Sequence, residues 1–487
     1  MGTPAGRWVL LATISGSGMA MLDATVVNIA LPSIGRDFGA DFRTLQWIVN
    51  AYTLTLAALI LLAGALGDRF GRRRVFVVGV VWFAVASLLC GLAPTAQVLV
   101  AARAAQGIGG ALLTPGSLAI ISSSFAATDR ARAVGAWSGL GGVAAAIGPF
   151  AGGYLVTLNW RAVFLVNLPI AVFTVVVALR HVPESLDTQS PPGLDVTGAA
   201  LTAVGLAGVT YALTSLGAGD GGNVALFVAG AGGLAALLTF VLVERRSPHP
   251  LVPLSLFANR RFSVTNAVTL LVYAALGVFF FLLVLQLQIV AGFSPLVAGT
   301  ALLPVTVLML LLSARAGALA ERIGPRLPMT VGPLLAAIGL LLTLRIGRRA
   351  SYLADVLPAV LVLGLGLSLT VAPLTATVLS SAAPRYAGTA SGVNNAIARA
   401  GGLLAVAVIP AAAGLGGADY TDPLSFEAGF HTAMVISAGL LALSSVLAAV
   451  LLRDPHEAPT AAGRIRVERC PHCAVAGPQL HPAQRGS

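Results

Sequence analysis

Apolar segments recur along the whole chain, separated by short polar connectors that are rich in charge or proline. Each apolar segment is long enough to cross a hydrocarbon core of about 30 Å as an α-helix of about 20 residues. The predicted first residues of these segments lie near positions 8, 46, 75, 97, 133, 162, 194, 223, 263, 296, 328, 353, 387 and 430. The pattern therefore predicts an all-α integral membrane protein with fourteen transmembrane helices.

A repeat relates the two ends of this pattern. GALGDRFGRR, residues 64–73, and GALAERIGPR, residues 317–326, both follow the pattern G-A-L-x-acid-R-x-G-x-R. Eight predicted spans separate the copies, and an even offset places both on the same side of the membrane, as two parallel halves of a transporter require. Six spans per half leave two between the halves. The predicted units are a six-helix bundle at 1–182, a linker with two additional helices at 183–261, a second six-helix bundle at 262–453 and a disordered cytoplasmic tail at 454–487.

Charge gives the orientation. Only 10% of the 487 residues are charged and 57% are hydrophobic, whereas soluble domains carry roughly 25% charged residues. All 29 basic residues are arginine; 20 fall in predicted cytoplasmic segments, 6 in outer loops, and the rest, Arg103, Arg315 and Arg399, within spans. The positive-inside rule then predicts that both termini are cytoplasmic. The arginines form no continuous basic face, so nucleic acid is not an expected partner.

Three motifs carry a family resemblance. GALGDRFGRRRV resembles the signature between spans two and three of the major facilitator superfamily, and the matching residues are Gly64, Asp68, Arg69, Gly71, Arg72 and Arg73. VLVAARAAQGIGGALLTPG, residues 98–116, resembles the span-four motif of that superfamily through Arg103. GVAAAIGPFAGG, residues 142–153, resembles the span-five motif of its antiporters, with the matching residues Gly135, Gly148, Pro149, Gly152 and Gly153. The resemblance implies gating by the first motif; close helix packing alone is the alternative for the third.

A further motif narrows the resemblance. LDATVVNIALP, which contains Asp23, is similar to the span-one motif of the fourteen-span drug:proton antiporters. This resemblance implies a proton-coupled antiporter that exports amphipathic drugs or antibiotics, driven by a proton gradient and without a cofactor. Its partners would be the lipid bilayer, protons and an amphipathic small molecule. The abundance of arginine, alanine and glycine suggests a bacterium, so the expected location is the bacterial cytoplasmic membrane.

Two alternatives remain beside this interpretation. A proton-coupled importer of a small polar nutrient would use the same fold, but it would need several polar side chains to replace the hydration of its solute. A membrane-embedded enzyme would need a metal site or a nucleophile with a base, and the spans contain no such constellation. Cys470 and Cys473 in the tail are only half of a structural zinc site, so no metal is expected.

The depths of two charged residues suggest that they meet. Counted from Trp8, Asp23 lies about 22 Å along the first span, which leaves roughly 8 Å to the outer boundary. Span four runs the opposite way from about Gln97, and this places Arg103 roughly 9 Å below the same boundary. Asp23 is therefore the predicted proton carrier, and Arg103 would tune its affinity for protons.

The substrate cavity is a weaker prediction. Polar and aromatic residues on spans that can line a central cavity are the candidates, because aromatic surfaces suit broad apolar specificity. These residues are Tyr52, Trp137, Asn167, Tyr273, Gln286, Asn394 and Asn395.

Overall fold

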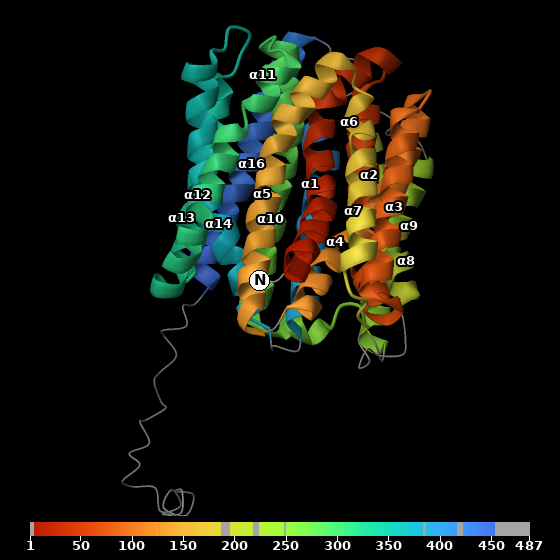
Figure 1. The fold of residues 1–487 in the computed structure, drawn as a ribbon. Coiled ribbons are helices and arrows are strands. Elements are labelled where there is room, and N and C mark those ends of the chain that lie inside the picture. The colour runs from red at the N-terminus through yellow and green to blue at the C-terminus, as the bar shows by residue number, and fades with distance from the viewer. Residues whose placement is uncertain are drawn as a thin grey trace, which may run out of the picture. The chain divides into compact units, whose positions relative to one another are not determined.

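The computed structural model describes residues 4–125, 127–186, 195–217, 224–247, 250–382, 386–415 and 422–452, which form the helices drawn in Figure 1. Within these ranges every regular element is helical and no strand occurs. The predicted tail at 454–487, including Cys470 and Cys473, lies outside the described residues. The expected all-α architecture is therefore confirmed for the described part of the chain.

Seven helices form the first half of the described chain. They are α1 (Pro4–Phe38), α2 (Phe42–Phe70), α3 (Arg72–Gly91), α4 (Ala96–Ser124), α5 (Ala127–Leu158), α6 (Ala162–Leu165) and α7 (Asn167–His181). Polar caps fix where two of them begin: the Asp41 carboxylate accepts the Thr44 backbone N–H at the start of α2, and the Thr95 hydroxyl accepts that of Val98 at the start of α4.

Two helices come next in the chain, α8 (Val196–Gly217) and α9 (Val224–Arg246), and they lie side by side in Figure 1. The later elements are η1 (Leu254–Ala258), α10 (Arg260–Leu285), η2 (Gln286–Val290), α11 (Pro295–Thr300), α12 (Leu303–Ile323), α13 (Arg326–Leu342), η3 (Thr343–Arg345), η4 (Tyr352–Val356), α14 (Leu357–Ser380), α15 (Ala387–Ala412) and α16 (Pro423–Leu451).

The described residues contain 13 helical segments that are long and apolar enough to cross a membrane. Some combine neighbouring elements; α11 and α12, for example, form the segment Pro295–Ile323. The expected span near residue 133 corresponds to α5, whose described apolar stretch is the shorter Ile147–Leu158. The count of fourteen and its division into six, two and six therefore remain predictions.

The repeated motif has the same backbone form in both copies. α2 ends at Phe70 and is followed by Gly71 with φ of 106°, while α12 ends at Ile323 and is followed by Gly324 with φ of 85°. Side chains with a Cβ rarely adopt such positive φ values, which explains a glycine at each position. Each copy thus joins two helices by a tight turn.

The first and second halves of the chain contact each other mainly through α2 and α5 of the first half. α2 packs against α15, and α5 packs against α11 and α12. α8 contacts both α2 and α15, so it covers one side of the seam between them. We call the contact between α2 and α15 the α2–α15 seam.

Candidate functional site

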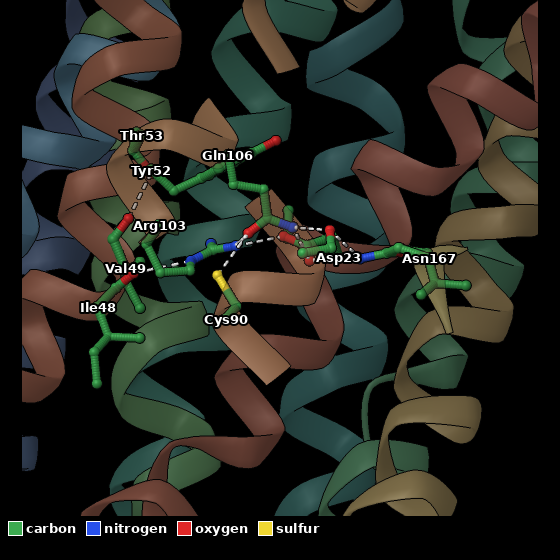
Figure 2. Close-up of polar contacts among 12 residues, drawn as sticks. Asp23, Ile48, Val49, Tyr52, Thr53, Cys90, Arg103, Gln106 and Asn167 are labelled. Carbon is green, nitrogen blue, oxygen red and sulfur yellow. Dashed lines mark hydrogen bonds and ion pairs between the residues drawn. The ribbon is translucent and has the colours of Figure 1, made fainter. Parts of the chain in front are cut away.

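Asp23 lies in α1 with its carboxylate fully buried among polar side chains (Figure 2). Its Oδ2 accepts a hydrogen bond from Arg103 Nη1 of α4 at 2.6 Å. Its Oδ1 accepts one from Gln106 Nε2 at 2.8 Å and one from Asn167 Nδ2, at the start of α7, at 3.0 Å. Three donors from two other helices therefore replace the water that an ionised carboxylate requires.

The Arg103 guanidinium is held by several groups besides Asp23. Its Nε donates to the Ile48 carbonyl at 3.1 Å, and its Nη1 also donates to Gln106 Oε1 at 2.5 Å. The guanidinium carbon lies 4.4 Å from the centre of the Tyr52 ring and 5.9 Å from that of Phe164. A buried ion pair is tolerated only when its geometry and remaining hydrogen bonds are good, and this pair meets that condition.

A serine that the sequence analysis missed completes the cluster. Ser87 of α3 is buried, and its hydroxyl accepts hydrogen bonds from Gln106 Nε2 at 2.8 Å and from Asn167 Nδ2 at 3.2 Å. The only sequence signal for it is a hydroxyl in an apolar span. Asn167, one of the residues predicted to line the substrate cavity, lies against Asp23. We call Asp23, Ser87, Arg103, Gln106 and Asn167 the Asp23 cluster.

The Asp23 cluster joins four helices. The charge-assisted hydrogen bond from Arg103 compensates the buried charge of the Asp23 carboxylate. α1, α3, α4 and α7 each contribute a side chain, so a relative shift of these helices would change these hydrogen bonds.

The motif at residues 64–73, for which the resemblance implies gating and which we call the gating motif, forms ion pairs at the junction of α2 and α3. Arg72 contacts Asp68 Oδ1 through Nη2 at 2.8 Å, one helical turn away. Arg69 lies over the ring of the neighbouring Phe70, 5.6 Å from its centre. Gly64 faces α4: a Cβ added to Gly64 would lie 3.8 Å from Pro115 of that helix.

Glu184, which follows α7, binds the same turn and was not expected from the sequence. Its carboxylate accepts the backbone N–H of Arg73 at 3.0 Å and that of Arg74 at 3.2 Å, both in the first turn of α3. An added Cβ on Gly71 would lie 2.8 Å from the Glu184 carboxyl carbon and would displace that side chain from its present position. The side chain of Arg73 also donates to the Val182 carbonyl at 3.1 Å. Glu184 therefore caps α3 and ties the gating motif to the end of α7.

The small residues of α5 permit close packing on two sides. An added Cβ on Gly148 would meet the Thr25 hydroxyl of α1, and one on Gly152 would lie 2.9 Å from Val26. An added Cβ on Gly153 would instead lie 2.7 Å from Leu296 of α11. α5 is therefore packed tightly between α1 and α11.

Two other members of this motif are placed less fully. The carbonyl of Pro149 lies against Gly299 of α11, which extends the contact between α5 and α11. The surroundings of Gly135 lie outside the described residues.

Two of the remaining cavity candidates, Trp137 and Gln286, make hydrogen bonds within the protein. Trp137 Nε1 donates to the Ser17 hydroxyl of α1 at 3.2 Å. Gln286 is buried, and its Nε2 donates to the Ile346 carbonyl at 2.6 Å, which lies in the same half of the chain. Trp137 thus joins α5 to α1, and Gln286 contacts the segment that follows η3.

Three further candidates lie on α10 and α15. Asn394 Nδ2 donates to Asn266 Oδ1 at 3.0 Å and to Thr269 Oγ1 at 2.7 Å, which fastens α15 to α10. Tyr273 of α10 is partly buried, whereas Asn395 of α15 is exposed. Asn395 thus remains accessible to a ligand.

Two glutamines join the two halves of the chain. Gln46 Nε2 of α2 donates to the Val406 carbonyl of α15 at 2.7 Å, and Gln288 Nε2 donates to the Ile29 carbonyl of α1 at 3.0 Å. Val406 has a free carbonyl because residue 410, four positions later, is Pro410 and has no N–H. We call Gln46 and Gln288 the glutamine clasp.

Comparisons with known proteins agree on the kind of molecule. The family model described as Major Facilitator Superfamily matches residues 13–406. The puromycin resistance protein pur8 of Streptomyces alboniger is 36% identical over 483 residues, which cover 95% of this chain and 95% of that protein. The multidrug resistance protein Stp of Mycobacterium tuberculosis is 35% identical over 405 residues, which cover 82% of this chain and 74% of Stp.

A solved structure shares the fold. A bacterial homologue of the human lysosomal transporter Spinster, in an inward-facing and unoccupied conformation, superposes with a TM-score of 0.65. The match covers 93% of this chain and 98% of that one at 17% sequence identity.

Proposed function

The chain belongs to the major facilitator superfamily, and we propose that it is a fourteen-span, proton-coupled antiporter that exports amphipathic drugs or antibiotics across the bacterial cytoplasmic membrane. The family supports transport as the activity. Export of drugs is supported by relatives that are named as resistance proteins and are similar over most of the chain. Both termini would then lie in the cytoplasm, as the arginine distribution predicts.

One observation carries the proton-coupled part of the proposal: the only described aspartate in the middle of a span is buried and bonded to an arginine of another helix. Insertion scales assign about +2.5 to +3.5 kcal/mol to a charged residue at the centre of a membrane helix. The Asp23 cluster reduces that penalty. A titratable group at such a position is expected to serve transport rather than stability.

The proposed cycle uses the Asp23 cluster as a switch. With Arg103 in contact, Asp23 is ionised and the cluster is closed. A shift of α1 against α4 within the first half, coupled to rocking of the two halves, would separate the two side chains, and Asp23 would then take a proton from the side with the higher proton concentration. The return movement would restore the contact with Arg103 and release the proton to the cytoplasm. The gating motif and the α5 glycines would move as packed units in this cycle.

Substrate flux in proteoliposomes tests the proposal, with puromycin as the probe and an imposed pH gradient as the driving force. Asp23→Asn keeps the shape of the side chain and removes its titration. We expect this variant to fold and to bind puromycin but to lose all flux that the gradient drives. Asp37→Asn is the matched control, because Asp37 lies on the same helix in an exposed ion pair with Arg161 at 2.9 Å.

The outcomes separate coupling from packing. Full gradient-driven flux through Asp23→Asn would refute the carrier role of Asp23. Equal losses in Asp23→Asn and Asp37→Asn would point to a general effect on α1. Wild-type protein that accumulates puromycin in the direction of import would instead support the alternative of an importer.

A further inference from the structure

Arg399 lies in the middle of a membrane-spanning helix, far from either boundary. Its span in α15 runs from Gly388 to Ala412, which puts Arg399 about 17 Å from the first and about 20 Å from the second at 1.5 Å per residue. An arginine side chain is too short to carry its charge to the interface over such distances. The guanidinium must therefore find its counter-charge within the protein or in a ligand.

The helical spacing shows which way Arg399 faces. Gly392, Arg399 and Val406 are each seven residues apart, so they lie on one face of α15. Gly392 lies against Leu61 of α2, and the Val406 carbonyl accepts a hydrogen bond from Gln46 of α2. Arg399 is exposed between these two contacts. It therefore faces the first half of the chain across the α2–α15 seam.

The lipid side of this seam is covered by another helix. Leu206 of α8 packs with Ala57 of α2 and with Leu403 of α15 in one apolar cluster. On the other side of α15, Asn394 and Gly402 contact α10. Arg399 thus faces α2, with Leu403 and α8 on one side of it and Gly402 and α10 on the other.

Tyrosines of two other helices lie at the level of Arg399. Tyr52 lies on α2 between Gln46 and Leu61, the two α2 residues that contact α15 on either side of Arg399. The carbonyl of Tyr273 of α10 would lie 3.5 Å from a Cβ added to Gly402, one turn after Arg399. Asn395, one turn earlier on α15, is exposed and uses its Nδ2 to donate to the Ser391 carbonyl at 3.1 Å.

No described carboxylate neutralises Arg399. Among the described residues its side chain has neither an ion pair nor a hydrogen bond, although Arg103, which lies within a span of the opposite half, has both. The described acids of the second half of the chain lie near helix ends, and they are Glu321, Asp355, Asp422 and Glu427. The missing counter-charge must come from outside this group.

From this geometry we propose that Arg399, exposed at the α2–α15 seam and without a described counter-charge, is the recognition site for an acidic group of the exported compound, so that anionic aromatic amphiphiles are substrates. The inference rests on the proposed function and adds the charge of the substrate. A carboxylate, phenolate or sulfonate would pair with the guanidinium.

Binding of two dyes to the purified full-length protein in detergent tests the inference. Fluorescein is a dianion at mildly alkaline pH, and tetramethylrhodamine methyl ester carries a positive charge on the same xanthene framework. Fluorescence anisotropy measures the affinity of each dye. We expect the wild type to prefer fluorescein, and Arg399→Gln to weaken fluorescein binding about tenfold without weakening the cationic dye.

Two further variants make the test specific. Arg399→Lys keeps the charge and should retain part of the fluorescein affinity. Arg315→Gln removes another exposed arginine from a span of the same half and should leave both affinities unchanged. Equal loss of both dyes in Arg399→Gln, an equal loss in Arg315→Gln, or a wild type that does not prefer fluorescein would overturn the inference.

The same protein in proteoliposomes distinguishes this inference from the proposed function. Binding of fluorescein through Arg399 without any gradient-driven dye flux would leave the anion site standing and refute proton-coupled export. Gradient-driven export of the cationic dye alone, unaffected by Arg399→Gln, would support export and refute the anion site.

Discussion

The glutamine clasp predicts how strongly the two halves are held together in the described conformation. Each of Gln46 and Gln288 donates one amide hydrogen bond to a carbonyl of the opposite half. Replacing glutamine by leucine keeps the approximate volume and removes the donor. A hydrogen bond of this kind contributes about 1 kcal/mol net, so each single change should shift the ratio of open to closed molecules about fivefold. The double variant should shift it about 30-fold if the two bonds act independently.

Distances between spin labels measure this ratio. Arg36 near the end of α1 and Val297 in α11 are exposed and belong to opposite halves, so cysteines at these positions can carry the labels. Cys470 and Cys473 are replaced by serine, while Cys90 is buried and can stay. Double electron–electron resonance should then reveal a larger population of long distances in the double leucine variant than in the parent protein.

A matched control tests the reasoning. Gln286 donates an equally buried amide bond, at 2.6 Å, to Ile346, but both residues belong to the second half of the chain. Gln286→Leu should therefore leave the open population unchanged. If the double variant shows the same distances as the parent, or if Gln286→Leu shifts them as much, the glutamine clasp does not govern this equilibrium.

Two further predictions concern the gating motif and α5. Glu184→Gln should slow transport severalfold without loss of expression, because the partly exposed ion pair between Glu184 and Arg73 contributes up to about 1 kcal/mol. The turnover rate of the reconstituted protein measures this effect. An unchanged rate would argue against a role of Glu184 in gating. Gly152→Leu should abolish transport or expression, since overpacking against Val26 costs about 1 to 3 kcal/mol. Gly232→Leu is the control and should retain both, because an added Cβ there meets nothing within 4 Å. Equal behaviour of the two variants in membrane fractions and flux assays would contradict the packing argument.

The contact between Asp23 and Arg103 shows how far depth alone can lead. The rise of an α-helix and the thickness of the bilayer are fixed, so the height of a residue follows from where its span begins. The helical rise and the bilayer thickness together predict that Asp23 and Arg103 lie at a similar depth, and the structure shows that the two side chains are in contact. The roles assigned to them remain proposals.

The other members of the Asp23 cluster could not be found in this way. Ser87 and Asn167 join the cluster because α3 and α7 are rotated so that these side chains point at Asp23, and rotation about a helix axis is not encoded by apolar length. The contact of Glu184 with Arg73 could not be found from the sequence either. The two residues are 111 positions apart, and only the packing of α7 against α3 brings them together.

The sequence by itself determined the features that depend on local chemistry and on the membrane as solvent. These are the apolar spans, the repeated motif at residues 64–73 and 317–326, and the presence of an aspartate and an arginine inside spans. The tertiary structure decided which polar groups satisfy one another, because a buried donor and its acceptor are selected by helix rotation, side-chain rotamers and close packing. That is why Asp23 has three donors while Arg399 is left with none of the described carboxylates.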